Sequence, residues 1–307
     1  MLSNFYKAKQ YIYFILKLTV VILALFLIYH RLSNNLTFNG ISFFELIKEK
    51  ITPFYIIILL ILSFINRFLE ILKWQNLVGF IKKISVYEAT KQVMAALTSG
   101  ILTPNNLGEY AGKALFFKKE KTKIIIFLNL VCNGIQMVLT VLFGVLALIY
   151  LKYYQLSLIV VLCLLALLIV VYFTKNITLK GFSLKKIGLK LHEIPKKIHQ
   201  KNAILGFCRY LVFSHQYYFL FKIFNVSVPY FTLMAAIAAM YFLASSLPSF
   251  QFLDFAVKGS VGILLFSPLG INEWVVAFIS MLMWLLNIAI PVLVGTYFVF
   301  QYKPKLQ

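Results

Sequence analysis

Long apolar stretches separated by short polar segments dominate the sequence. Eight of them have lengths compatible with a membrane-crossing helix of about 20 residues, although the seventh is short for a complete crossing. The pattern therefore predicts a polytopic helical membrane protein. The predicted spans are Tyr11 to Tyr29, Pro53 to Leu72, Ile124 to Leu151, Leu156 to Phe173, Ile204 to Phe224, Tyr230 to Leu247, Gly259 to Leu269 and Trp274 to Phe300.

The composition agrees with the membrane class. Of the 307 residues, 62% are hydrophobic and 13% are charged, and the mean hydropathy is +0.89. A soluble globule of this composition would lack the polar residues to cover its surface. We therefore predict an all-α integral membrane protein, a helical bundle of about eight spans that forms a single transmembrane domain over residues 1–307.

The charges orient this arrangement. Lys and Arg number 30 against 9 Asp and Glu, and the formal net charge is +21. In the eight-span arrangement 22 of the cations fall on one side of the membrane and 5 on the other. Because positively charged short loops stay in the cytoplasm, both termini and the lysine-rich loop 175–201 are predicted to be cytoplasmic. This loop is also expected to contact anionic lipid.

One segment, residues 92–113, does not fit a pattern of spans and loops. It is semi-apolar, rich in small residues, and broken by the run Thr103-Pro104-Asn105-Asn106, with basic residues on both flanks. Since both flanks lie on the same side, we predict a re-entrant hairpin, which is tolerated only inside protein or beside a wet cavity. Asn105 or Asn106 can cap a helix that starts near Leu107, and the free N–H groups of that helix would suit a phosphate.

Candidate site residues follow this break. Glu109 and Lys113 lie one helical turn apart, so they can pair when the site is empty and separate when a charged headgroup arrives. Gly108, together with Gly112, lets another backbone or a headgroup come close. The alternative is a salt bridge at the membrane edge that only stabilises a bend.

A second break, from Ser245 to Gly259 with Pro248 within it, carries a similar pair. Asp254 and Lys258 follow Glu109 and Lys113 by 145 residues. A four-plus-four internal repeat would explain this offset, with parallel halves 1–174 and 202–307 joined by the loop 175–201. Coincidence among acid–base pairs at the membrane edge is the alternative.

Further polar residues lie within or at the ends of spans. Arg67 and Glu70 share a face at the end of the second span, where an interfacial anchor is the alternative to a binding role. Arg209, in the fifth span, either faces the bundle interior or reaches back to the interface. The third span carries a polar face that would line a polar path or bond another helix. Its members are Asn129, Asn133 and Gln136.

Common enzyme signatures do not fit. The run from Gly108 to Ala114 is one residue short of a phosphate-binding loop and lacks its Ser or Thr, and His192-Glu193 lacks the second His of a zinc protease. The three cysteines stand singly in apolar runs. We therefore predict no cofactor, metal, disulfide or enzymatic signature.

The run from Thr103 to Lys113 resembles the T-P-x-x-x-G-E-x-x-x-R/K signature of the lysylphosphatidylglycerol synthase transmembrane-region family, also called flippase-like domain proteins. Glu70-x-x-Lys73-Trp74 and the element from Leu247 to Lys258 are similar to further parts of its pattern. The resemblance implies a bacterial inner-membrane protein of about eight spans that moves a lipid or lipid-linked headgroup between leaflets. Glu109 and Lys113 would take the acid and base positions, with Lys113 lacking the bidentate fork of the usual Arg.

Three functions remain open at this point. The leading one is a lipid translocator whose partners are phospholipids, anionic or aminoacylated, and which would not synthesise the aminoacyl lipid itself. The second is an integral-membrane transferase that acts on a lipid-linked substrate, with Glu109 or Asp254 as base. The third is a noncatalytic membrane partner subunit. A homo-oligomer or a separate lipid-modifying enzyme would be a compatible partner, and no nucleic-acid partner is expected.

Overall fold

The computed structural model describes residues 51–101, 103, 107–177 and 183–302, together with positions 15, 19, 22, 23, 26, 28–30, 45 and 47–50. All regular secondary structure in these residues is helical. The first predicted span, Tyr11 to Tyr29, is described only at isolated positions, and Pro104, Asn105 and Asn106 lie outside the described residues.

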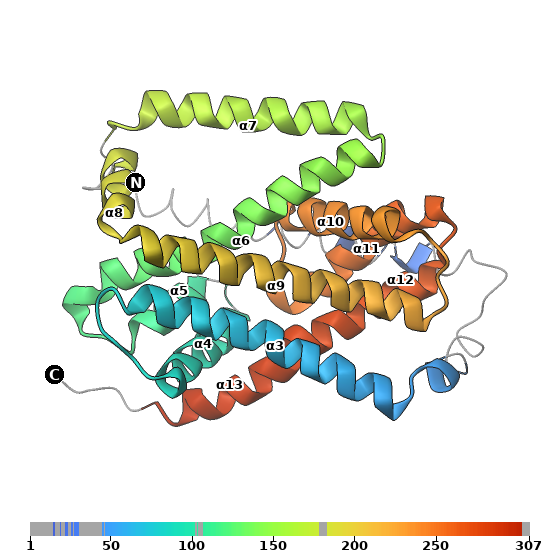
Figure 1. Cartoon of the computed structure of the whole chain (residues 1–307), viewed down its shortest axis with the longest axis horizontal. Helices are drawn as coiled ribbons and strands as arrows, with labels where there is room; N and C mark the ends of the chain where they lie inside the picture. The colour runs from blue at the N-terminus through green and yellow to red at the C-terminus, as the bar shows by residue number, and fades with distance from the viewer. Residues whose placement is uncertain are drawn as a thin grey trace.

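The helices follow one another with short connections (Figure 1). Short 3₁₀ turns precede α6 and α11 and follow α11, and a π-helical segment, Leu285–Ala289, joins α12 to α13. The helices are α3 (Pro53–Val78), α4 (Val86–Ile101), α5 (Leu107–Ala114), α6 (Thr122–Tyr150), α7 (Tyr154–Thr174), α8 (Leu184–Glu193), α9 (Lys196–Ile223), α10 (Tyr230–Ser246), α11 (Asp254–Phe266), α12 (Glu273–Trp284) and α13 (Ile290–Phe300).

The described part of the chain contains five helical stretches that are long and apolar enough to cross a membrane. This confirms the helical membrane class. The 28-residue α9 is not among the five because Arg209, His215 and Gln216 lower its hydropathy, and α10 is apolar but has 17 residues. The number of spans therefore stays a prediction. The five stretches are Pro53–Val78, Lys119–Tyr150, Tyr154–Thr174, Gln251–Leu269 and Glu273–Phe300.

Local sequence signals explain several helix ends. Pro53 opens α3, where its missing N–H costs nothing because the first turn has no intrahelical acceptor. Ser183 caps α8 by accepting a hydrogen bond from the backbone N–H of Lys186 at 3.2 Å. Asn272 caps α12 in the same way through the N–H of Trp274 at 2.8 Å.

Packing contacts join residues 53–150 to residues 196–300, which are called the two parts of the chain below. Helices α3 and α9 pack along each other, α4 and α5 form one hairpin, and α10 and α11 form a second. Helix α6 packs on α10, and α13 packs on α4, so a helix of residues 53–150 covers the second hairpin and a helix of residues 196–300 covers the first. Helix α7 lies at the edge of the fold in Figure 1, next to the end of α6, and is exposed over almost its whole length.

Glycines permit the closest helix contacts. A Cβ added at Gly144 of α6 would overlap Phe242 of α10, and one at Gly295 of α13 would overlap Thr98 and Met94 of α4. Lipid gives apolar helices no hydrophobic reason to associate, so small residues that let backbones approach supply much of the attraction.

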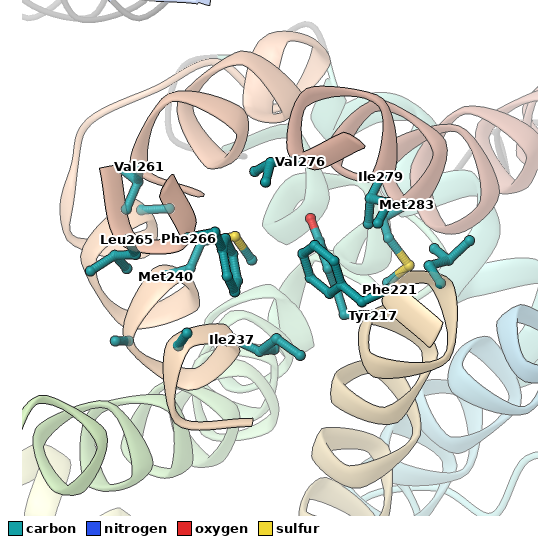
Figure 2. Packing of buried hydrophobic residues seen from close by; sticks show 14 of the residues in the cluster. Tyr217, Phe221, Ile237, Met240, Val261, Leu265, Phe266, Val276, Ile279 and Met283 are labelled. Carbon is teal, nitrogen blue, oxygen red and sulfur yellow. The ribbon is translucent and has the colours of Figure 1, made fainter. Parts of the chain in front are cut away.

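The largest buried apolar cluster lies among α9, α10, α11 and α12. Figure 2 shows Tyr217 and Phe221 of α9 facing residues of the other three helices. The rings of Phe221 and Phe266 lie 4.8 Å apart. A smaller cluster around the fully buried Trp74 joins α3 to α6. These two clusters fix the positions of the helices that line a cavity.

Candidate functional site

A cavity of about 830 Å³ lies where α3, α6, α9 and the two hairpins meet. Its wall is unusually polar for a chain with so many apolar residues, and both parts of the chain contribute to it. The polar residues in the wall are Asn66, Arg67, Glu70, Glu109, Asn133, Gln136, Thr140, Arg209, Ser245, Ser246, Ser249, Gln251, Asp254, Lys258 and Asn287.

Most of the residues predicted from the sequence meet in this cavity. Gly108 and Lys113 do not line it, and Asn106 lies outside the described residues. The two predicted breaks therefore bring their acids to one shared space. The predicted residues in the wall are Arg67, Glu70, Glu109, Arg209, Asp254 and Lys258.

Glu70 is the centre of a buried ionic network. Its Oε2 atom accepts from the Nζ of Lys73 at 3.1 Å and from the Nη1 of Arg209 at 3.0 Å. The Sγ of Cys132 lies 3.5 Å from its other oxygen. A buried carboxylate needs such partners, because the free energy lost with its hydration must be offset by hydrogen bonds and opposite charges. Glu70 thus lies inside the bundle, and Arg209 faces the interior.

A chain of amides extends this network across three helices. The Nε of Arg209 donates to Asn66 at 3.0 Å, and the amide of Asn66 donates to the Oδ1 of Asn287 at 2.6 Å. Asn287 donates in turn to Gln216 at 3.1 Å, and Gln216 donates to the hydroxyl of Ser63 at 2.7 Å. This chain ties α3, α9 and the π-helical segment to one wall of the cavity.

The π-helical segment gives Arg67 its partner. Pro291 has no N–H, so the carbonyl of Asn287, four residues earlier, lacks its usual helical donor. The Nη2 of Arg67 donates to that carbonyl instead. The Nε of Arg67 and the Nε2 of Gln136 are buried and have no hydrogen-bond partner among the described residues. Such π-helical insertions are frequent at functional sites.

In the first ionic pair, Glu109 lines the cavity and Lys113 lies on the side of Glu109 away from it. The Nζ of Lys113 lies 3.1 Å from the Oε1 of Glu109 and 2.6 Å from the Oδ1 of Asn129, and 4.7 Å from the ring centre of Trp74. The Lys113 side chain is 0% exposed and the Glu109 side chain is 17% exposed. Lys113 therefore holds Glu109 and does not face the cavity.

Gly108 has a packing role in this structure. A Cβ at this position would overlap the backbone of Ser99 in α4. Its N–H donates to the Oγ1 of Thr103 at 2.8 Å, so this N–H at the start of α5 already has a partner. The prediction that a headgroup phosphate binds the first turn of α5 gains no support from this geometry.

In the second ionic pair, both members face the cavity. Asp254 and Lys258 form a salt bridge, and their side chains are 19% and 22% exposed. The Nζ of Lys258 also lies 5.0 Å from the ring centre of Tyr241. This pair can reach a ligand directly.

The charges in and behind the wall do not balance. Arg67, Arg209 and Lys258 line the cavity, and Lys73 and Lys113 are buried behind it. These five cations stand against three carboxylates, an excess of two positive charges. This excess favours an anionic group in the cavity. The carboxylates are Glu70, Glu109 and Asp254.

Sequence reasoning missed Asn287, which joins the amide chain and accepts from Arg67. A signal was present, because Asn287 is the single Asn in the long apolar run 274–300 and a proline follows it by four residues. Tyr241 and Gln251 were missed too, since neither stands out from its surroundings in the sequence.

No protein-family model matches this chain, and comparison with curated proteins finds no relative.

Proposed function

We propose that this chain moves the headgroup of a membrane lipid between leaflets through the cavity, as a multi-pass protein of a bacterial inner membrane with cytoplasmic termini. The observation that carries the proposal is a charged cavity, open on one side, among helices that are apolar on the outside. Charged groups at such a depth are costly and mark substrate pathways in membrane proteins.

The cavity offers complementary groups for a phospholipid headgroup. Arg209 and Arg67, which both line the cavity, would hold the phosphate, because guanidinium groups match its oxygens. Glu109 and Asp254 would attract a headgroup amine. The acyl chains would remain in lipid beside Met137, which is part of the cavity wall and is 70% exposed. Lys113 would act indirectly, by holding Glu109 in place.

The charge of the cargo decides whether movement can be passive. For a headgroup of net charge +1, outward movement against 100 mV, inside negative, costs about 2.3 kcal/mol. A neutral or anionic headgroup does not carry this cost. Of these two, the excess of cationic residues at the cavity favours the anionic headgroup.

Leaflet exchange in reconstituted vesicles tests the proposal. Purified protein would be placed in vesicles that contain fluorescent phosphatidylglycerol or phosphatidylcholine, and an impermeant quencher would report which leaflet the label occupies. We expect wild type to exceed protein-free vesicles and Glu109→Gln to be slow. Glu193→Gln, which changes an exposed acid of α8 outside the cavity, is the matched control. Equal rates for wild type and Glu109→Gln would refute this mechanism.

The same vesicles separate the other two functions. A transferase would change the mass of the lipid during the incubation, and mass spectrometry of the extracted lipid detects this. For a noncatalytic partner subunit, Lys113→Ala would lower stability while leaving the lipid distribution at the protein-free level.

A further inference from the structure

Two parts of the chain contain the same elements in the same order. Residues 53–150 form a long helix, a hairpin and a second long helix, namely α3, α4–α5 and α6. Residues 196–300 repeat this as α9, α10–α11 and α12–α13. The lengths agree, since α3 and α9 have 26 and 28 residues and α4 and α10 have 16 and 17.

The contacts between the two parts also repeat, with the roles exchanged. Helix α6 packs on α10, and its counterpart α13 packs on α4, the counterpart of α10. A glycine allows the close approach in both cases, with Gly144 against Phe242 and Gly295 against Thr98. Such reciprocal contacts are expected when two copies of one unit are related by a twofold axis.

The direction of the helices shows how the copies are related. Along α3, the contacts move from Tyr55 through Ser63 to Glu70. Their partners in α9 run backwards, from Phe219 through Gln216 to Arg209. The equivalent helices are therefore antiparallel, as the corresponding helices of an inverted repeat are. The α4–α5 hairpin returns to its starting side, so α6 and α7 are the only described long helices between α3 and α9, and α9 starts on the side where α3 ends.

The charges around the hairpins agree with an inverted arrangement. Lys82, Lys83, Lys118 and Lys119 flank the α4–α5 hairpin. By contrast, Lys222 and Glu273 flank the α10–α11 hairpin. Because lysines gather on the cytoplasmic side, the first hairpin enters from the lysine-rich face and the second from the lysine-poor face.

We propose that residues 53–150 and 196–300 form an inverted repeat whose two hairpins are gates that enter the membrane from opposite faces and meet at the cavity. A hairpin that enters from one face fills the space between that face and the middle of the bundle, so it blocks that route to the cavity. Each second arm carries an acid near its start and a lysine one turn later, Glu109–Lys113 and Asp254–Lys258. Inverted repeats with a site at their interface are a common basis of alternating access.

The two gates differ in how tightly they are closed. Ser245, at the end of α10, is exposed and lines the cavity. Its counterpart 145 residues earlier, Gly100, is buried against Glu109. Thr98 also bonds the carbonyl of Val292 in α13 at 3.1 Å, which fastens the first hairpin to the second copy. The first gate is thus closed, and opening it requires α4 to separate from α13.

The orientation of the gates can be tested without any transport measurement. Lys83→Cys and Ser227→Cys place a thiol at an exposed position just before each hairpin. Cys163 and Cys208, the accessible native cysteines among the described residues, would be changed to Ser. We expect an impermeant maleimide to label the two variants from opposite faces of sealed vesicles. Labelling of both from one face would overturn the inverted repeat.

A lock tests the gating itself. Gln136→Cys places a reporter thiol in the cavity wall, and Thr98→Cys with Val292→Cys places two thiols where α4 contacts α13, for cross-linking by oxidation. We expect oxidation to abolish reporter labelling from the lysine-rich face and to preserve it from the lysine-poor face, with reduction restoring both. Loss from neither face, or from both, would overturn the gating. The gating rests on the proposed function only for the identity of the cargo. Both of its tests measure thiol labelling, so a failure of the inverted repeat or of the gates can be told apart from a failure of lipid exchange.

Discussion

The two acid–lysine pairs have the same spacing in the sequence and different surroundings in the structure. Lys113 is fully buried between Glu109, Asn129 and the ring of Trp74. Lys258 is partly exposed, and beside Asp254 it contacts the ring of Tyr241. A spacing of four residues therefore predicts that an acidic and a basic side chain form an ion pair. The neighbouring helices determine whether that ion pair is buried as a structural support or lies in the cavity wall.

The neighbours explain the difference. Asn129 of α6 and Trp74 of α3 both reach Lys113. Counted from the paired glycines Gly144 and Gly295, the counterpart of Asn129 is Ser280, whose side chain is shorter and has no amide. The second pair therefore lacks the amide that holds the first pair in place.

The largest expected effect is on stability, and it separates the two lysines. Lys113→Met leaves the carboxylate of Glu109 and the amide of Asn129 without their buried cation, and we expect a loss of about 3–5 kcal/mol. Lys258→Met removes a partly exposed salt bridge and a cation–π contact, and we expect a smaller loss of about 1–2 kcal/mol. Thermal unfolding of the purified protein in detergent compares them. Equal losses in the free energy of unfolding would contradict the account, because they would mean that the burial of Lys113 does not make its ion pair more stabilising than that of Lys258.

The next effect concerns Arg209, which contacts Glu70 and Asn66 from the opposite part of the chain. Arg209→Gln removes a charged hydrogen-bond donor, worth about 1.5–3 kcal/mol, so leaflet exchange should slow by roughly 10- to 100-fold. Lys222→Gln changes an exposed cation near the end of the same helix and should leave the rate unchanged. A comparable slowing in both variants would point to net charge and not to the cavity.

A smaller effect is expected at Pro291. Pro291→Ala supplies an N–H that can bond the carbonyl of Asn287 and displace Arg67 from it. The loss of one hydrogen bond, about 0.5–1.5 kcal/mol, would slow exchange by roughly two- to tenfold while the protein stays folded. Exchange at the wild-type rate would show that this contact of Arg67 does not matter for transport.

The smallest effect distinguishes the ring of Tyr241 from its hydroxyl. Tyr241→Phe keeps the aromatic face beside Lys258 and should change neither stability nor exchange. Tyr241→Leu removes the cation–π contact together with the ring contacts to Phe213 and Tyr217, so it should cost at least the value of the cation–π contact, about 0.5–1 kcal/mol, in thermal unfolding. If the phenylalanine variant lost as much as the leucine variant, the hydroxyl and not the ring would be the important group.

Part of this arrangement could be predicted from the sequence. Apolar length predicts helices, and the 145-residue offset between Glu109 and Asp254 indicates that the two breaks are related. The orientation of the copies could not be predicted from this offset, because a spacing along the chain carries no direction in space. The burial of Lys113 could not be predicted either, since it depends on Asn129 and Trp74 reaching it from two other helices. Gly108 fits a headgroup site and a close helix contact equally well in the sequence, and the structure shows the close contact.

Blocking the cavity tests the central claim most directly. In Gln136→Cys, a bulky maleimide would occupy the cavity wall, whereas in Val138→Cys the same group would attach to an exposed position of α6 outside the cavity. Leaflet exchange would be measured for each variant before and after complete modification. We predict that modification stops exchange in Gln136→Cys and leaves Val138→Cys unchanged. Undiminished exchange through fully modified Gln136→Cys would contradict a headgroup path through this cavity.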